Sequence, residues 1–252
     1  ISPMTNPVFF EDPRTVTEAR FIFLNNSIPN ALGGGDAQLY ATQLRVALSD
    51  DISIIAAKDG FIVSQNPLLD DGFADISVGL KANVWKDACL QRILSVGASY
   101  ELPIGSTRAL QGNGDGEFHL FATGGTEFLG NMHYVTASGF RLPANTAQES
   151  QVWYWSNHVD LQAGDTGLYL FGETNWYHWM RSGNAFPVPV EGVDLINLGA
   201  VGVAGNDIAT AAFGVKYKPS CHTELGIAYE IPMTDRRDIL QNRLTFDWIL
   251  RY

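Results

Sequence analysis

The sequence predicts an all-β fold, a transmembrane antiparallel up-and-down β-barrel of about twelve strands. Three observations lead to this prediction. Apolar and polar residues alternate along short segments throughout the chain, as in strands with one apolar face. Short and long connections between these segments also alternate. No apolar stretch reaches about 20 residues, so a membrane-spanning helix is excluded, whereas spanning strands are short and only half apolar.

The composition narrows the function classes. The 252 residues could form one large all-β domain or two smaller ones. They are 46% hydrophobic, 12% aromatic and only 17% charged, which argues against disorder. The net charge of −11 makes nucleic acid an unsuitable partner, because phosphate contacts need a basic face.

The last ten residues carry the clearest strand pattern. From Leu244 to Tyr252 every second residue is apolar or aromatic, and most residues between them are polar or charged. The segment resembles the closing strand of Gram-negative outer-membrane β-barrels, whose C-terminal aromatic residue is recognised by the insertion machinery. The resemblance implies that four residues form such an insertion signal: Phe246, Trp248, Leu250 and Tyr252.

Eleven further segments resemble strands. The alternation is strict in 40–48, 75–84, 94–102 and 224–231, and looser in 118–128, 152–161, 168–179 and 211–217. It is ambiguous in phase near 20–26, 52–63 and 132–142. Together with 243–252 these segments give the expected count of about twelve.

The connections test this count. Five are short, at 49–51, 86–91, 129–131, 162–166 and 218–222, and six are longer, at 27–37, 64–72, 103–116, 143–150, 182–209 and 233–242. They alternate only if Val193–Ala204 belongs to a loop rather than to a strand. We therefore expect a barrel over 18–252 with both termini periplasmic, and a loop over 182–209 that is extracellular or folded into the lumen.

A soluble β-sandwich is the competing fold. No linker divides the chain, and the faces opposite the apolar ones combine small polar residues with charges of both signs, as a lumen would. Aromatic residues also gather toward strand ends, as interface girdles require. The expected girdle residues are Tyr40, Trp85, Tyr100, Trp153, Trp155, Trp176, Trp179, Tyr217, Trp248 and Tyr252.

Residues 1–17 differ from the rest of the chain. Pro3, Pro7 and Pro13 prevent regular strand pairing there, and Phe9 and Phe10 form an apolar pair. We expect a periplasmic lead-in segment, which lies in the periplasm or tucks into the lumen and could dock a partner. The absence of a leader sequence fits an exported protein whose signal peptide has been removed.

The charged residues in inward phase are the candidate lumen lining. They form a mixed set without a ring of one sign, so they could pair across the lumen and close it, or line a narrow channel. The set is Arg45, Lys81, Glu101, Glu127, Asp160, Glu173, Lys216, Glu230, Arg243, Asp247 and Arg251. Tyr169, Phe171 and Tyr177 are the only hint of an aromatic track.

No motif indicates catalysis, so we expect no enzyme, cofactor or metal. Outer-membrane lipases with a serine nucleophile and a histidine base are the enzymatic alternative. Ser156 and His158 share one face of a strand, but at positions i and i+2 they are too far apart for the direct hydrogen bond that a nucleophile and its base need. Cys89 and Cys221 lie in turns on nearly opposite sides of the expected barrel, which predicts two free thiols. The histidines have no metal-ligand spacing.

A wider resemblance involves the last forty or so residues. Phe213–Tyr217, Gly226–Pro232, the loop with Asp235 and Arg236, and the closing strand are similar to a group of porin-like or transporter-like outer-membrane barrels that we associate with planctomycete-type bacteria. The resemblance implies the fold and an outer-membrane location, with lipid and the barrel-insertion machinery as partners. We expect a narrow passive channel for small polar solutes. The alternative is a closed structural or scaffolding barrel that anchors a partner protein at the outer membrane. The sequence does not decide whether the chain forms a homo-oligomer or binds a periplasmic partner.

Overall fold

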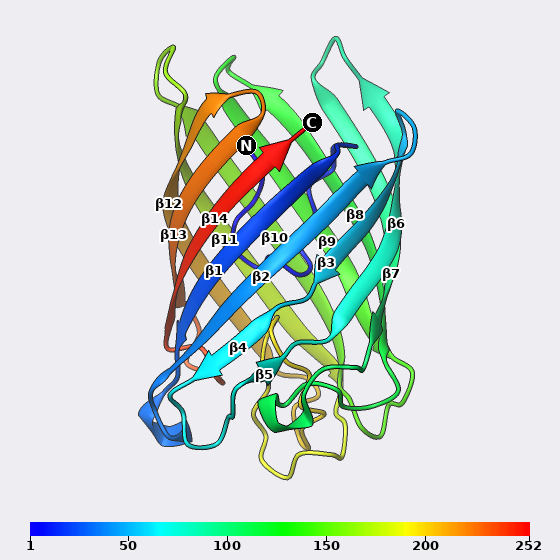
Figure 1. Cartoon of the computed structure of the whole chain (residues 1–252), viewed down its shortest axis with the longest axis vertical. Helices are drawn as coiled ribbons and strands as arrows, with labels where there is room; N and C mark the ends of the chain where they lie inside the picture. Colours follow the sequence, from blue (N-terminus) through cyan, green and yellow to red (C-terminus); the bar gives the residue numbers. More distant parts are fainter.

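The strands form a closed antiparallel ring. β1 (Glu18–Ser27) pairs with β2 (Asp36–Ala47) on one side and with β14 (Asn242–Arg251) on the other, so the computed structural model has no free sheet edge there (Figure 1). It describes all residues, 1–252. The remaining strands are β3 (Ile52–Lys58), β4 (Phe61–Ser64), β5 (Gly72–Phe73), β6 (Ile76–Asp87), β7 (Arg92–Leu102), β8 (Glu117–Phe128), β9 (Met132–Pro143), β10 (Gln151–Gln162), β11 (Leu168–Arg181), β12 (Asp207–Ser220) and β13 (Thr223–Pro232).

These fourteen strands occupy twelve positions in the wall. β3 and β4 both pair with β2 and together make one interrupted strand, and β5 continues into β6 in the same way. At the first interruption the Asp59 carboxylate accepts a hydrogen bond from the Thr42 amide, 2.8 Å away. Gly60 follows with φ +126°, a backbone conformation that favours glycine. The predicted all-β class and strand number are confirmed.

Each predicted strand is present, with changes at its ends. The strand predicted at 52–63 is broken at Asp59–Gly60, and β12 starts four residues before the predicted Ala211. Val193–Ala204 lies in the loop between β11 and β12, as the alternation of connections requires. Two short 3₁₀ helices, η1 (Asn30–Leu32) and η2 (Thr107–Ala109), lie in other long loops, and no helix has the length and apolarity to cross a membrane.

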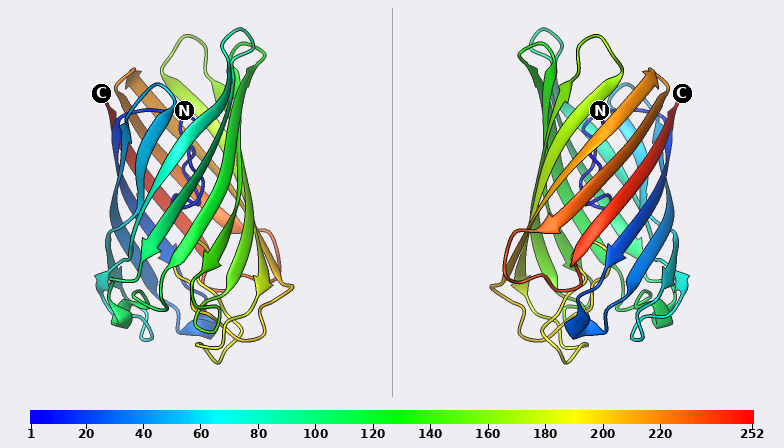
Figure 2. Two further views of the ribbon diagram at one scale, coloured as in Figure 1. Left: turned by 90° about the vertical axis from the view of Figure 1, so that its right-hand side faces the viewer. Right: turned by 90° about the vertical axis from the view of Figure 1, so that its left-hand side faces the viewer.

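The two rims of the barrel differ. Both chain ends and the short turns lie at one rim, and the longer loops cluster at the other (Figures 1 and 2). We call these the terminal rim and the loop rim. Cys89 and Cys221 are free and exposed in turns of the terminal rim.

The outside of the barrel is apolar. Large hydrophobic side chains are exposed on every long strand, among them Leu80, Leu120, Leu170, Phe213 and Ile227. Such a surface is stable only when lipid or another apolar layer covers it. The expected girdle residues point outward with one exception: Trp179 is 1% exposed, and its prediction was wrong. It shares the inward phase of Tyr177 on β11, whereas Trp176, three residues away, faces outward.

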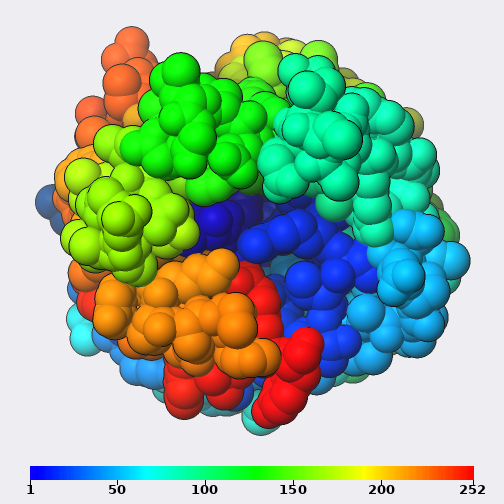
Figure 3. Space-filling view, turned by 90° about the horizontal axis from the view of Figure 1, so that it is seen from above, coloured from blue at the N-terminus to red at the C-terminus, as the bar shows by residue number.

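The inside of the barrel is filled rather than open. Residues 1–12 run down into the ring from the terminal rim and are buried, apart from the half-buried Ile1 (Figure 2). Seen from above, the atoms of the N-terminal part of the chain occupy the centre of the ring (Figure 3). Of the two places expected for this segment, periplasm and lumen, the structure has the lumen.

Candidate functional site: the closed lumen

Residues 1–12, here called the N-terminal segment, are held by charges on the wall. The Glu11 carboxylate accepts hydrogen bonds from Arg45 of β2, at 2.7 and 2.5 Å, and from Lys81 of β6, at 2.8 Å. Burial by itself favours the neutral acid, but the charges of Arg45 and Lys81 outweigh it and lower the pKa of the Glu11 carboxyl to about 2. Glu11 is therefore ionised at neutral pH and anchors the segment.

Hydrogen bonds to carboxylates and to neutral groups of the wall hold the rest of the segment. On β11, Glu173 accepts hydrogen bonds from the amides of Met4 and Thr5, at 2.7 and 2.6 Å. Asn6 donates to the hydroxyl of Ser156, and the Phe9 carbonyl accepts from Tyr154, at 3.0 and 2.8 Å. Backbone N–H and C=O groups of a buried irregular segment need such partners, because they have no hydrogen bonds within a strand and are shielded from water.

The predicted lumen charges all lie on the inner side of the wall, and all but Glu127 have an oppositely charged group or a histidine within 4 Å. Glu127 is half-buried at the terminal rim. Partners from the predicted set itself are few, such as Lys216 with Asp247 at 2.9 Å and Arg243 with Glu230 at 3.5 Å. The other pairs are Arg45 with Glu11 and Glu18, Lys81 with Glu11, Glu101 with Lys58, Asp160 with His133, His158 and the Ile1 ammonium group, Glu173 with His158, Lys216 with Glu224, Arg243 with Asp194, Asp247 with Arg20, and Arg251 with Glu18 and Glu224.

Several charged residues of the lumen escaped the sequence analysis for local reasons. Arg20, Lys58 and Arg141 lie on the three strands whose alternation is ambiguous in phase, so their inward direction could not be assigned. Glu11 lies outside any strand, and periodicity says nothing about where an irregular segment runs. Its position between proline residues and next to two phenylalanines was the one available signal.

The loop Ser182–Asn206, here called the cover loop, lies over the lumen at the loop rim. Glu191 of this loop accepts hydrogen bonds from the Ser150 hydroxyl and from the amides of Leu198 and Ala200, at 2.6, 2.9 and 2.8 Å. Two wall arginines hold the loop from the lumen side. Arg141 donates a hydrogen bond to the Val193 carbonyl, and Arg243 pairs with Asp194 at 2.8 Å. The loop is thus fixed to the wall by buried polar contacts.

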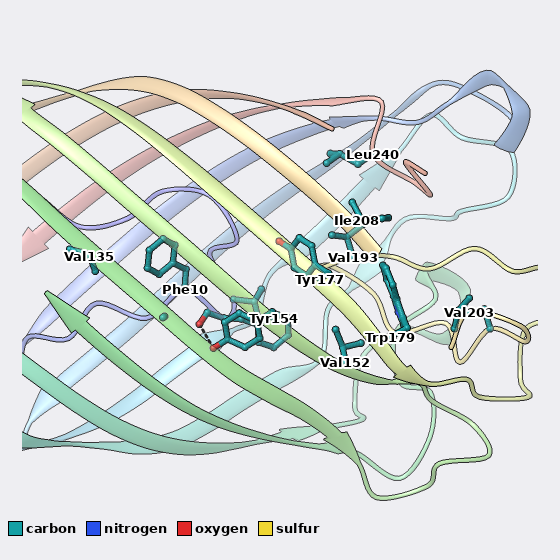
Figure 4. Close-up of a cluster of buried hydrophobic side chains, with 14 residues drawn as sticks. Phe10, Val135, Val152, Tyr154, Tyr177, Trp179, Val193, Val203, Ile208 and Leu240 are labelled. Carbon is teal, nitrogen blue, oxygen red and sulfur yellow. Dashed lines mark hydrogen bonds between the residues drawn. The ribbon is translucent and has the colours of Figure 1, made fainter. Parts of the chain in front are cut away.

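A hydrophobic cluster joins the cover loop to the N-terminal segment. Phe10 of the segment, Tyr154, Tyr177 and Trp179 of the wall, and Val193 of the loop belong to one cluster of 14 buried residues (Figure 4). The Arg141 guanidinium lies over the ring of Phe9, 4.5 Å from its centre. Consequently the two pieces that close the lumen support each other.

Ser156 and His158 do not form a nucleophile and base. Both ring nitrogens of His158 contact carboxylates, Nδ1 with Glu173 at 2.7 Å and Nε2 with Asp160 at 3.0 Å. The Ser156 hydroxyl instead accepts the hydrogen bond from Asn6. Tyr169, Phe171 and Tyr177 do point inward, but Phe171 packs with Met4 and Tyr177 lies in the cluster with Phe10, so they form no open aromatic track.

The residues of the expected insertion signal lie on the outer surface near the terminal rim. Phe246, Trp248 and Tyr252 are exposed, and Leu250 is half-buried. Phe246 contacts Phe23, and Trp248 contacts Phe21, across the β1–β14 pairing that closes the ring. The signal itself stays a prediction.

Comparison with solved structures identifies proteins of similar fold, whereas comparison of sequences does not. No protein-family model and no curated protein sequence matches the chain. Similar solved structures include the COG4313 outer membrane channel from Pseudomonas putida F1, with a TM-score of 0.63, 8% identity and 100% of both chains covered. The NanC porin has a TM-score of 0.57 at 9% identity, over 94% of this chain and 98% of that chain. The KdgM porin has 0.56 at 8%, over 93% and 99%. The chain is therefore similar in fold to outer-membrane β-barrel porins and channels.

Proposed function

We propose that this chain is a bacterial outer-membrane channel for small polar solutes, which the N-terminal segment and the cover loop close in the conformation described. One observation carries the proposal. The wall is a complete twelve-strand ring with a charged interior, and none of residues 1–17 belongs to its sheet. The segment can therefore leave the lumen without breaking a strand pair.

The orientation follows from the rims. In bacterial outer-membrane barrels the short turns face the periplasm and the longer loops face outward. The terminal rim, with both ends of the chain, is then periplasmic, and the cover loop faces the outside. The outward residues from Phe246 to Tyr252 would serve as the insertion signal, and the N-terminal segment would enter the lumen from the periplasmic side.

The size of the ring limits the solute. A twelve-strand wall is narrower than the 16 to 18 strands of porins with open aqueous channels. Its interior charges have both signs, so emptying the lumen would leave a narrow polar path without a ring of one sign. Small solutes of either charge fit such a path better than large or strongly selected ones.

A closed structural barrel is the second candidate. It is favoured by the pairing of nearly every interior charge and by the cover loop, which is held by Arg141 and Arg243. In that case the interior pairs serve stability alone and the filled lumen is the working state. The two candidates differ in one property, the passage of solute after the closing pieces are moved.

Solute flux into liposomes distinguishes the candidates. Three proteins are compared: the whole chain, a variant without residues 1–12, and the same variant with the cover loop shortened between 186 and 203. Circular dichroism and heat-dependent gel mobility establish that each barrel has folded. The channel proposal predicts faster entry of small sugars in one or both variants. If both folded variants remain as tight as empty liposomes, the closed barrel is correct.

A further inference from the structure

An apolar cavity lies inside the barrel next to the N-terminal segment. Its volume is about 110 Å³, and 19 of its 27 lining residues are hydrophobic. Ile22, Leu39 and Ile62 form the side toward the wall, from β1, β2 and β4. Val8 of the segment and Ile196 and Leu198 of the cover loop form the opposite side. The cavity therefore lies between the wall and both closing pieces.

The polar side chains at its wall are already engaged with the protein. Gln43 donates to the carbonyls of Pro7 and Ala57, Lys58 pairs with Glu101, and Asn66 donates to the carbonyls of Leu32 and Gly34. Asn26, Gln38, Asp59 and Gln111 also have protein partners. Each of these polar side chains thus has at least one protein partner, and most of the cavity lining is hydrocarbon.

We propose that this cavity is a binding site for one small, uncharged apolar molecule of about the size of a benzene ring. A water molecule needs roughly 10–15 Å³ and two or more polar partners, so a space of this size that is lined mainly by hydrocarbon stays dry. An apolar cavity of roughly 150 Å³ takes up benzene, which places the present one near the size of a single ring. A charged or strongly polar molecule would lose its hydration without compensation.

The site would contain a different class of molecule from the solute of the proposed channel. The interior charges that pair across the lumen favour polar solutes, whereas the cavity favours hydrocarbon surface. Its occupant would touch Val8 and Ile196 together, so it would add contacts between the N-terminal segment and the cover loop. Binding does not require the lumen to open, and it can be tested whether or not the barrel conducts.

Fluorine NMR of fluorobenzene with the whole chain in lipid nanodiscs tests the proposal. The proposal predicts a bound signal that saturates at one molecule per chain, that toluene displaces and that benzoate leaves unchanged. In Ala37→Leu, the added side chain fills the cavity and abolishes the saturable signal. In Ala122→Leu, which adds the same volume on the exposed outer face of β8, the signal persists.

Two results would overturn the proposal. The first is a signal that only grows in proportion to the probe, as it does in empty nanodiscs. The second is a saturable signal that Ala37→Leu retains. If Ala37→Leu does not fold, crystals of the unchanged chain under xenon pressure decide: xenon density between Leu39, Ile62 and Ile196 supports the site, and its absence rejects it.

Discussion

Glu11 and Arg45 form a two-point ion pair in which both carboxylate oxygens accept hydrogen bonds from the guanidinium, at 2.7 and 2.5 Å. Glu11 belongs to a segment without regular structure, and Arg45 belongs to the wall of the barrel. Lys81 adds a third contact to the same carboxylate. A single side chain thus ties the N-terminal segment to two strands that do not pair with each other.

Replacing this side chain should loosen the segment. In Glu11→Gln, Lys81 loses its only carboxylate partner and remains buried, and breaking a buried pair in this way costs roughly 3–5 kcal/mol. We expect faster amide exchange at Met4, Thr5 and Phe10, measured by hydrogen–deuterium exchange, with strand amides unchanged. The control is Asp51→Asn, which breaks an exposed pair with Lys86 at the rim. Equal protection of the segment in both variants would contradict its anchoring by Glu11.

Glu149, in the loop before β10, should make stability depend on pH. Burial, followed by the nearby charges of Glu117 and Glu101, raises the pKa of its carboxyl to about 8, and one of its oxygens has no hydrogen-bond partner. The raised pKa means that the folded barrel holds a proton that the unfolded chain releases near its usual pKa of about 4.3. Keeping this proton, or ionising the buried carboxyl, costs the folded barrel free energy relative to the unfolded chain. This free-energy cost is absent below about pH 4.3, grows as the pH rises toward 8 and is complete above about pH 8.

Glu149→Gln removes this cost. The variant should resist urea better than the unchanged chain at pH 9, by up to about 5 kcal/mol, because each pKa unit corresponds to about 1.4 kcal/mol, and it should match the unchanged chain at pH 4. The midpoint of unfolding in liposomes, followed by tryptophan fluorescence across this pH range, gives the comparison. A difference that is constant with pH would show that Glu149 does not titrate between the two states.

The outer face of β12 tests contact with lipid. Phe213 is 64% exposed at the middle of this strand. Phe213→Arg should destabilise the barrel in a bilayer by roughly 2–4 kcal/mol, because it places a charge in hydrocarbon. Leu129→Arg changes a side chain that is 82% exposed in a turn of the terminal rim and should cost little. If urea unfolding in liposomes gives the same stability for both, this face does not meet lipid.

Two tryptophans on neighbouring strands should lose unequal amounts of stability when they are replaced by alanine. Trp179 is buried in the hydrophobic cluster, with the Arg236 guanidinium 5.3 Å from its ring centre, so Trp179→Ala should cost roughly 3–5 kcal/mol. Trp155 points outward, where lipid can fill the space that Trp155→Ala leaves. Its loss should cost less and should instead reduce fluorescence quenching by brominated lipid. A larger stability loss for Trp155→Ala would reverse the assigned directions.

The wall was predictable from sequence because strand periodicity and loop length are local properties. The alternation from Leu244 to Tyr252 was sufficient to assign the faces of β14, and loop alternation placed Val193–Ala204 outside the wall. The contents of the lumen were not predictable in the same way. Glu11 meets Arg45 and Lys81 only after the ring has closed, and Trp179 was misassigned because residue type was given more weight than its phase relative to Tyr177.

The most direct test of the account pins the segment inside the lumen. The Asn6 amide and the Ser156 hydroxyl lie 3.0 Å apart, so cysteines at these two positions can be joined by a short reducible crosslinker during refolding. Cys89→Ser and Cys221→Ser remove the exposed native thiols, Glu11→Gln weakens the natural anchor, and the cover loop is shortened between 186 and 203 so that it does not close the lumen by itself. In planar bilayers we predict no current from the crosslinked protein and channel openings after dithiothreitol cleaves the link. Currents that are the same before and after cleavage, or silence in both states, would contradict a lumen closed by a removable segment.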